Sequence, residues 1–158
     1  MKALEGRLVV PENQKIGVVV ARFNELVTER LLEGAVWSFN RHGGNSESQI
    51  EIVRVPGAFE LPVAALKMAQ SGRFAAIVCL GCVIRGATSH YDYVCGQAAS
   101  GVASVALQTG VPTIFGVLTT DTLEQAFDRA GAKAGNKGAE AMDAALEMAD
   151  LLRQIEAA

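Results

Sequence analysis

The sequence predicts a single α/β domain in which helices cover both faces of a four-stranded parallel sheet, giving three layers. Two patterns indicate this class: four short apolar runs alternate with stretches of helical spacing, and the runs lack the polar alternation of half-exposed strands. The composition agrees, because 50% of the 158 residues are hydrophobic and only 20% are charged, with a mean hydropathy of +0.24. A chain of this length buries roughly 70% of the surface that its unfolded form exposes, so its core requires neither disulfide nor metal.

The predicted strands are β-branched apolar runs that mostly end at glycine, proline or threonine. They cover residues 16–21, 50–55, 74–80 and 113–118. Helical crossovers of this length place successive strands in parallel, with right-handed connections.

Helices are predicted between and after these strands from apolar residues three and four positions apart. The first contains 26–39, the second 61–68, the third 89–108 and the last 138–155. A fourth helix is expected between Asp121 and Gly131, because Asp121 and Glu124 resemble a capping box. No composition shift divides the chain, so we expect one domain over 1–158. Residues 1–12 should form a peripheral arm, in which Leu8–Val10 is either an edge strand, which can belong to another subunit's sheet, or mobile.

Charge and cysteine content exclude several classes of protein. A net charge of −3 and a pI near 5.4 leave no basic footprint for nucleic acid, and no apolar run reaches the ~18 residues that span a bilayer. Three cysteines without an apolar leader favour a reducing, cytoplasmic location. The 25 alanines and 16 glycines suggest close helix contacts, some of them with other copies of the chain.

Ligands of open parallel sheets bind outside the carboxyl ends of the strands, so the segments that follow the strands are the candidate site. After the third strand, Gly86-Ala87-Thr88 at a helix start has the outline of a phosphate cradle. The lysine of a nucleotidase P-loop is replaced by Ala87. The alternative is a loop that only turns and caps the helix through Thr88 or Ser89.

Other candidate residues surround this cradle. His90, in the first turn of the third helix, can act as a general acid or base, or can be a polar surface residue. Phe23 and Phe59 follow the first two strands and Phe115 is expected near the end of the fourth, where flat apolar rings suit a planar heterocycle unless they belong to the core. Glu60 is a hydrogen-bond acceptor for a polyol or amine, or an ordinary first-turn acid.

Two cations and two cysteines have competing interpretations. Arg129 can clamp a phosphate and Lys137 can face a carbonyl or oxyanion, but both can equally be helix-end cations. Cys79 and Cys82 look like C-x-x-C, yet residues three apart in a strand point to opposite faces, which argues against metal or redox pairing.

Taken together, ARFN, VPGAFELP, GCVIRGATSHYDYV, FGVLTTDTLEQAFDRAG and KAGNKGAEA resemble the lumazine synthase family over essentially the whole chain. The resemblance implies a flavodoxin-like fold and the penultimate step of riboflavin biosynthesis. In that step 5-amino-6-(D-ribitylamino)uracil and 3,4-dihydroxy-2-butanone 4-phosphate condense to 6,7-dimethyl-8-ribityllumazine, phosphate and water, with neither cofactor nor metal.

The resemblance also implies roles for individual residues. His90 corresponds to the family's proton-transfer histidine, and Phe115 to an aromatic contributed across a subunit boundary. The phosphate would be bound by Gly86, Ala87, Thr88 and Arg129. The pyrimidine and ribityl chain would be bound by Phe23, Ala58, Phe59, Glu60, Cys82, Val83, Ile84 and Lys137.

Family members form homopentamers, and many build icosahedral shells of sixty subunits that can associate with riboflavin synthase. The short link from Arg129 to Gly138 favours shell formation by this resemblance. Two rival classes stay open: an FMN-binding electron carrier, which would be yellow when purified, and a purely structural shell protein, which would make no lumazine.

Overall fold

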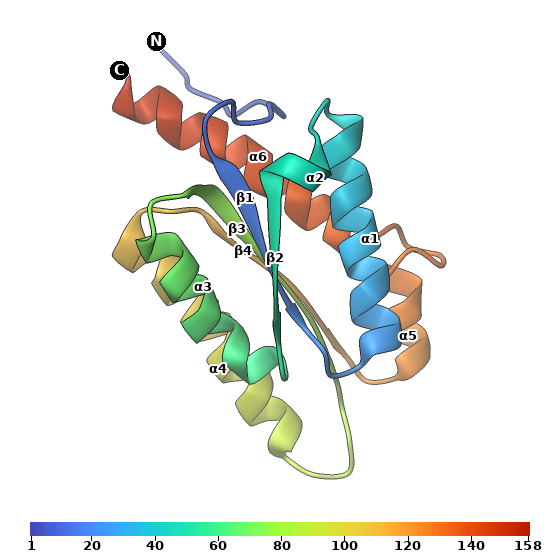
Figure 1. The fold of residues 1–158 in the computed structure, drawn as a ribbon. Helices are drawn as coiled ribbons and strands as arrows, with labels where there is room; N and C mark the ends of the chain where they lie inside the picture. The colour runs from blue at the N-terminus through green and yellow to red at the C-terminus, as the bar shows by residue number, and fades with distance from the viewer.

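The computed structural model describes residues 1–158 and has the predicted three-layer α/β architecture (Figure 1). The strands are β1 (Lys15–Ala21), β2 (Ile50–Val55), β3 (Phe74–Ile84) and β4 (Thr113–Thr120). They pair in parallel in the order β2-β1-β3-β4, so β2 and β4 are the edges of the sheet. The predicted fold class is confirmed.

Helices cover both faces of the sheet. On one face lie α1 (Glu25–Arg41), α5 (Leu123–Arg129) and α6 (Lys137–Glu156), whose buried side chains join Val18, Val78 and Leu80 in one core cluster. On the other lie α3 (Leu61–Gln70) and α4 (His90–Thr109), in a second cluster (Figure 1). The inner strands β1 and β3 are therefore buried on both sides, which is why they read as continuous apolar runs, whereas the edge strand β2 is only partly buried and contains Glu51 and Arg54.

Several local details differ from the sequence analysis. Strand β3 continues four residues beyond Leu80, and Gly81 lies inside it rather than at a turn. An added Cβ on Gly81 would lie 3.2 Å from Leu61 Cδ1 and 3.4 Å from Val117 Cγ1, so glycine relieves close packing there.

Two short helices were not expected, and one cap was assigned to the wrong residue. The two unexpected helices are α2 (Ser46–Gln49), which is too polar to show apolar spacing, and the 3₁₀ turn η1 (Ala58–Glu60). Thr122, not Asp121, caps α5, because its hydroxyl accepts a bond of 3.2 Å from Gln125 N.

The N-terminal arm forms no strand within this chain and lies along α6 (Figure 1). The side chain of Asp150 is buried, at 2% exposure, and accepts hydrogen bonds from the Arg7 backbone N (3.0 Å) and from Arg7 Nε (3.2 Å). Gln154 adds a bond of 2.8 Å to the Glu5 carbonyl, and Val10 packs against the core. The arm is thus attached to its own α6; pairing with another subunit stays a prediction.

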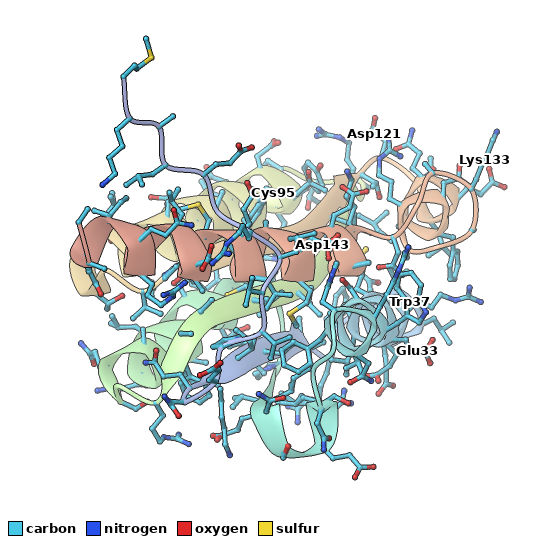
Figure 2. All side chains as sticks on the ribbon, turned by 90° about the horizontal axis from the view of Figure 1, so that it is seen from above. Glu33, Trp37, Cys95, Asp121, Lys133 and Asp143 are labelled. Atoms are coloured by element: carbon cyan, nitrogen blue, oxygen red, sulfur yellow. The ribbon has the colours of Figure 1, made fainter.

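Helix α1 packs closely against α6. Asp143 on α6 projects toward α1 (Figure 2), where its Oδ1 accepts a hydrogen bond from Ser38 and lies 3.2 Å from His42 Nε2. Asn136 precedes α6 and links it to α1, because its amide donates to the Arg30 carbonyl (2.9 Å) while its oxygen caps the first turn of α6. This contact determines where the first residues of α6 lie.

Helix α4 is covered on one stripe only. Ala98, Val102 and Val105 are buried against the sheet and α3. The opposite face is exposed and mostly small, with a large side chain near each end. Its residues recur three and four positions apart: Tyr93, Gly96, Ser100, Ala103 and Leu107.

No helix of the chain combines the length and apolarity needed to cross a bilayer.

Candidate functional site

The loops that follow β1 and β2 are hydrogen-bonded to one another at the carboxyl edge of the sheet. Arg22 N donates to the Val55 carbonyl (2.8 Å) and Phe23 N donates to the Pro56 carbonyl (3.1 Å). The segment after β3 is joined in the same way to β4, through Arg85 N and the Thr120 carbonyl (2.8 Å). These bonds continue the sheet pairing past the strand ends. They join the loops after β1, β2 and β3 and the end of β4 into one continuous edge, which we call the rim.

Asn24 connects the two halves of this rim. It is the only non-glycine residue with a positive φ (φ 59°, ψ 47°), and its side-chain amide donates to the Cys82 carbonyl on β3 (2.8 Å). A left-handed residue is costly, and such residues persist where the surroundings require them, often at functional sites. Asn24 had no predicted role; the signal that could have identified it is an asparagine between a strand and a helix, because this residue type tolerates a positive φ.

Two aromatic rings stand on the rim beside a buried turn. Phe23 is 70% exposed and Phe59 is 56% exposed, so neither belongs to the core of the single chain. Ala58 is buried beneath them in the cluster on the α3 face. Glu60 ends η1, and its Oε2 lies near Gly57, so the carboxylate folds back over the turn. An apolar surface beside a carboxylate can hold a flat heterocycle with a polar substituent.

The end of β3 leads directly into the candidate phosphate turn. Cys82 is buried and Val83 and Ile84 are half-buried, whereas Gly86, Ala87 and Thr88 are exposed. The capping alternative receives little support, because Ser89 makes no side-chain cap and the one hydrogen bond that Thr88 Oγ1 accepts, from His90 N, is long at 3.4 Å. Asp92 N is already engaged by the Ser89 carbonyl (3.1 Å), so at this end of α4 it is the weakly bonded N–H of His90 that can turn toward an anion.

His90 is the first residue of α4 and is exposed on the same rim. Its side chain makes no hydrogen bond within the chain, which leaves both ring nitrogens available for proton transfer. The predicted position in the first helical turn is confirmed, and its chemical role stays a prediction.

A second group of predicted residues lies elsewhere. Phe115, Arg129 and Lys137 line a cleft of about 450 Å³ along the free edge of β4. Phe115 is the third of eight residues in β4, not near the carboxyl end as expected. Five residue steps of ~3.3 Å separate it from Thr120, a distance of about 16 Å along the strand.

The two cations in this cleft differ in their surroundings. Arg129 ends α5 and donates to the Gln125 carbonyl (3.3 Å), which fits a cation at a helix carboxyl end. Lys137 begins α6, where the helix dipole disfavours a positive charge, and it pairs with Glu140 at 2.6 Å. The helix-end interpretation therefore accounts for Arg129 but not for Lys137.

One chain does not bring the two groups into one pocket. None of Phe23, Phe59, Glu60 or His90 lines the cleft that contains Phe115, Arg129 and Lys137. The cleft lies at an unpaired sheet edge, a surface that a second chain can cover.

The cysteines face opposite sides of the sheet, as their spacing predicts. Cys79 belongs to the core cluster on the α3 face and Cys82 to the cluster on the α6 face. Burial raises the pKa of the Cys79 thiol to about 12 and that of Cys82 to about 11. Both are therefore protonated near neutral pH, and thiols in that state are poor nucleophiles and metal ligands. No group of three or more His, Cys, Asp and Glu side chains is arranged to hold a metal ion.

Comparison with known protein families gives one match of nearly full length. The model of the family described as 6,7-dimethyl-8-ribityllumazine synthase matches residues 13–153. The match contains all four strands and both groups of candidate residues, and it omits only the N-terminal arm (residues 1–12) and the residues from Gln154 to the end of the chain.

Proposed function

Because the chain belongs to the 6,7-dimethyl-8-ribityllumazine synthase family, we propose that it condenses 5-amino-6-(D-ribitylamino)uracil with 3,4-dihydroxy-2-butanone 4-phosphate. The products are 6,7-dimethyl-8-ribityllumazine, phosphate and water. The observation that carries this proposal is the hydrogen-bonded rim, in which an exposed aromatic pair, a helix N-terminus and a histidine follow adjacent strands.

Different residues of the rim bind different parts of the two substrates. Phe23 stacks on the pyrimidine, and the backbone of Ala58 and Phe59 with the Glu60 carboxylate holds the ring and the ribityl chain. The backbone at the end of β3 completes this part of the pocket through Cys82, Val83 and Ile84. The N–H groups of Gly86, Ala87 and Thr88 receive the phosphate, because helix N-termini favour anions.

The reaction requires orientation and several proton transfers. The 5-amino group of the uracil attacks the ketone carbonyl and water leaves, giving an imine; loss of a proton and of phosphate, followed by tautomerisation, produces a new carbonyl. The ribitylamino nitrogen attacks that carbonyl, and loss of a second water closes the ring of the lumazine. His90 moves protons between the amine, the carbonyl oxygen and the leaving groups, a contribution of about 10²–10⁴-fold for a positioned acid or base. Holding the two substrates together supplies much of the remaining rate, with no cofactor or metal.

A second copy of the chain completes this site. Phe115 lies about 16 Å along β4 from the rim of its own chain, and Arg129 and Lys137 line the same cleft as Phe115, so we assign all three to the rim of a neighbour. There Arg129 clamps the phosphate and Lys137 faces the pyrimidine. The exposed small-residue stripe of α4 and the open edge of β4 provide surfaces for this association, and the assembly is a homopentamer that can extend to an icosahedral shell.

The direct test is the fluorescence of lumazine formed from the two substrates, with phosphate release measured in parallel. His90→Ala should slow turnover by about 10²-fold without abolishing it. Arg129→Ala should raise KM for the phosphorylated ketone far more than KM for the uracil. Purified protein that is yellow, reversibly reducible and inactive in this assay would instead indicate an FMN-binding electron carrier.

Mixing two impaired variants tests the shared site. His90→Ala and Arg129→Ala chains, dissociated and reassembled together, regain turnover if neighbouring chains share a site, because some sites then contain both native residues. Activity that stays at the level of the separate variants would place each complete site within one chain. Light scattering decides separately between a pentamer and a shell.

A further inference from the structure

The candidate phosphate turn makes few contacts of its own. Residues 85–89 connect β3 with α4, and every one of them is exposed. A Cβ added to Gly86 would meet no atom within 4 Å. A turn that binds an anion through its backbone N–H groups must nevertheless hold those groups in one arrangement.

Arg85, the first residue of this segment, makes the contacts that the turn lacks. Its Nε donates to Asp121 Oδ1 (2.9 Å), its NH1 lies 3.6 Å from Asp92 Oδ1, and its guanidinium lies 4.3 Å from the centre of the Tyr91 ring. Asp121 follows β4 and stands at this end of the molecule (Figure 2), while Tyr91 and Asp92 lie in the first turn of α4. One side chain thus joins the start of the turn, the helix that follows the turn and the end of the neighbouring strand.

The charges around Arg85 argue against its being an anion ligand. Two carboxylates face its guanidinium, so its charge is compensated and its Nε is already engaged. Arg129, by contrast, has no carboxylate partner within ion-pair distance and donates only to a backbone carbonyl.

We propose that Arg85 is a positioning residue that holds the Gly86-Ala87-Thr88 turn in its phosphate-binding conformation through Asp121, and that Arg85 does not itself bind the phosphate. This inference rests on the proposed function of the same turn. Without the link, the turn spends only a fraction of its time in the competent conformation, and the apparent affinity for phosphate falls by that fraction.

The variants that test this are Arg85→Gln, Arg85→Lys and Asp121→Asn. We expect Arg85→Gln and Asp121→Asn each to raise KM for the phosphorylated ketone about 5–10-fold while KM for the uracil changes less than about twofold. Arg85→Lys should recover part of the loss, because an ammonium can reach Asp121 but does not stack flat on Tyr91. Arg73→Gln is the matched control, since it breaks an exposed pair with Glu51 at the opposite end of the sheet.

The sign of the Asp121→Asn effect separates the two roles. If Arg85 bound the phosphate directly, removing its competing carboxylate would lower KM for the ketone, and that result would overturn the proposal. Equal changes in both KM values, or no change in either, would overturn it as well.

Binding of inorganic phosphate, measured by calorimetry on the same variants, provides a readout that does not depend on turnover. Weaker phosphate binding by Asp121→Asn in a protein that makes no lumazine would support the role of Arg85 and refute the proposed reaction. If the parent makes lumazine but Arg85→Gln and Asp121→Asn bind phosphate as tightly as the parent does, only the role of Arg85 would be refuted. A parent that neither binds phosphate nor makes lumazine would refute both.

Discussion

Gly138 lies where α6 crosses α1. Adding a single methyl group at this position should lower the free energy of unfolding more than at any other glycine. A Cβ on Gly138 would lie 1.8 Å from the Leu31 carbonyl oxygen, 2.6 Å from its carbonyl carbon and 2.8 Å from its Cα. All three atoms belong to the backbone of α1 at the buried residue Leu31, so no side chain can rotate away. Gly138→Ala therefore forces α6 and α1 apart.

The size of the effect follows from this geometry. Real Cβ atoms essentially never approach other heavy atoms closer than 3.0 Å, so the contact of 1.8 Å requires a displacement of about 1.2 Å. Overpacking costs typically 1–3 kcal/mol, and a contact with rigid backbone belongs at the upper end of that range. Alanine regains up to about 1 kcal/mol of helix propensity. We expect Gly138→Ala to lower the free energy of unfolding by about 2 kcal/mol.

Urea unfolding followed by circular dichroism measures this difference, at one protomer concentration because association shifts the apparent stability. The control is Glu140→Ala, two residues further along α6. Its ion pair with Lys137 is exposed and contributes little, so the free energy of unfolding should change by no more than about 0.5 kcal/mol. A Gly138→Ala protein as stable as the parent would show that α1 and α6 do not approach as closely as described.

Three further predictions concern the rim, the arm and the assembly. Asn24→Ala should destabilise by about 1–3 kcal/mol, because it removes the bond to the Cys82 carbonyl and leaves alanine with a positive φ; Asn24→Gly tolerates the backbone and should cost less in the same urea titration. Hydrogen bonds from Arg153 and Arg7 hold the pKa of the Asp150 carboxyl well below its usual range, so its contribution is present above about pH 4 and is lost as the pH falls below that value. Asp150→Asn should therefore lower stability at pH 7 by about 1.5 kcal/mol and have a smaller effect at pH 3; an equal effect at both pH values would contradict the charged role of this carboxylate. Gly96→Ala adds a methyl group that meets nothing within 4 Å in the single chain, so it should stabilise an isolated subunit but weaken association through α4; light scattering that shows unchanged particles would mean that this stripe is not an interface.

Local sequence pattern predicted the elements of the fold but misplaced several of their ends. The inner strands β1 and β3 were recognised because both of their faces are buried, which produces uninterrupted apolar runs. The end of β3 was missed because Gly81 was interpreted as a turn, whereas the structure shows that it accommodates Leu61 and Val117. The cap of α5 was displaced by one residue because Asp121, Thr122, Glu124 and Gln125 offer two overlapping capping pairs, and only the backbone geometry selects Thr122.

The sequence likewise predicted some residues of the candidate site and missed others. The residue types after each strand, together with the topology rule for parallel sheets, predicted that Phe23, Phe59 and His90 would share one edge. Arg85 received no role, because its partner Asp121 is 36 residues away and follows a different strand.

By itself, the sequence determined the alternation of strands and helices, the apolar faces that pack them and the residue types at the strand ends. These properties depend on periodicity and composition, which neighbouring residues carry within a short window. The tertiary structure decided that Asn24 reaches Cys82 across 58 residues, and that Phe115, Arg129 and Lys137 gather along the open edge of β4 rather than on the rim. Those placements depend on strand order and register, which arise from packing between distant segments and leave no local signal in the chain.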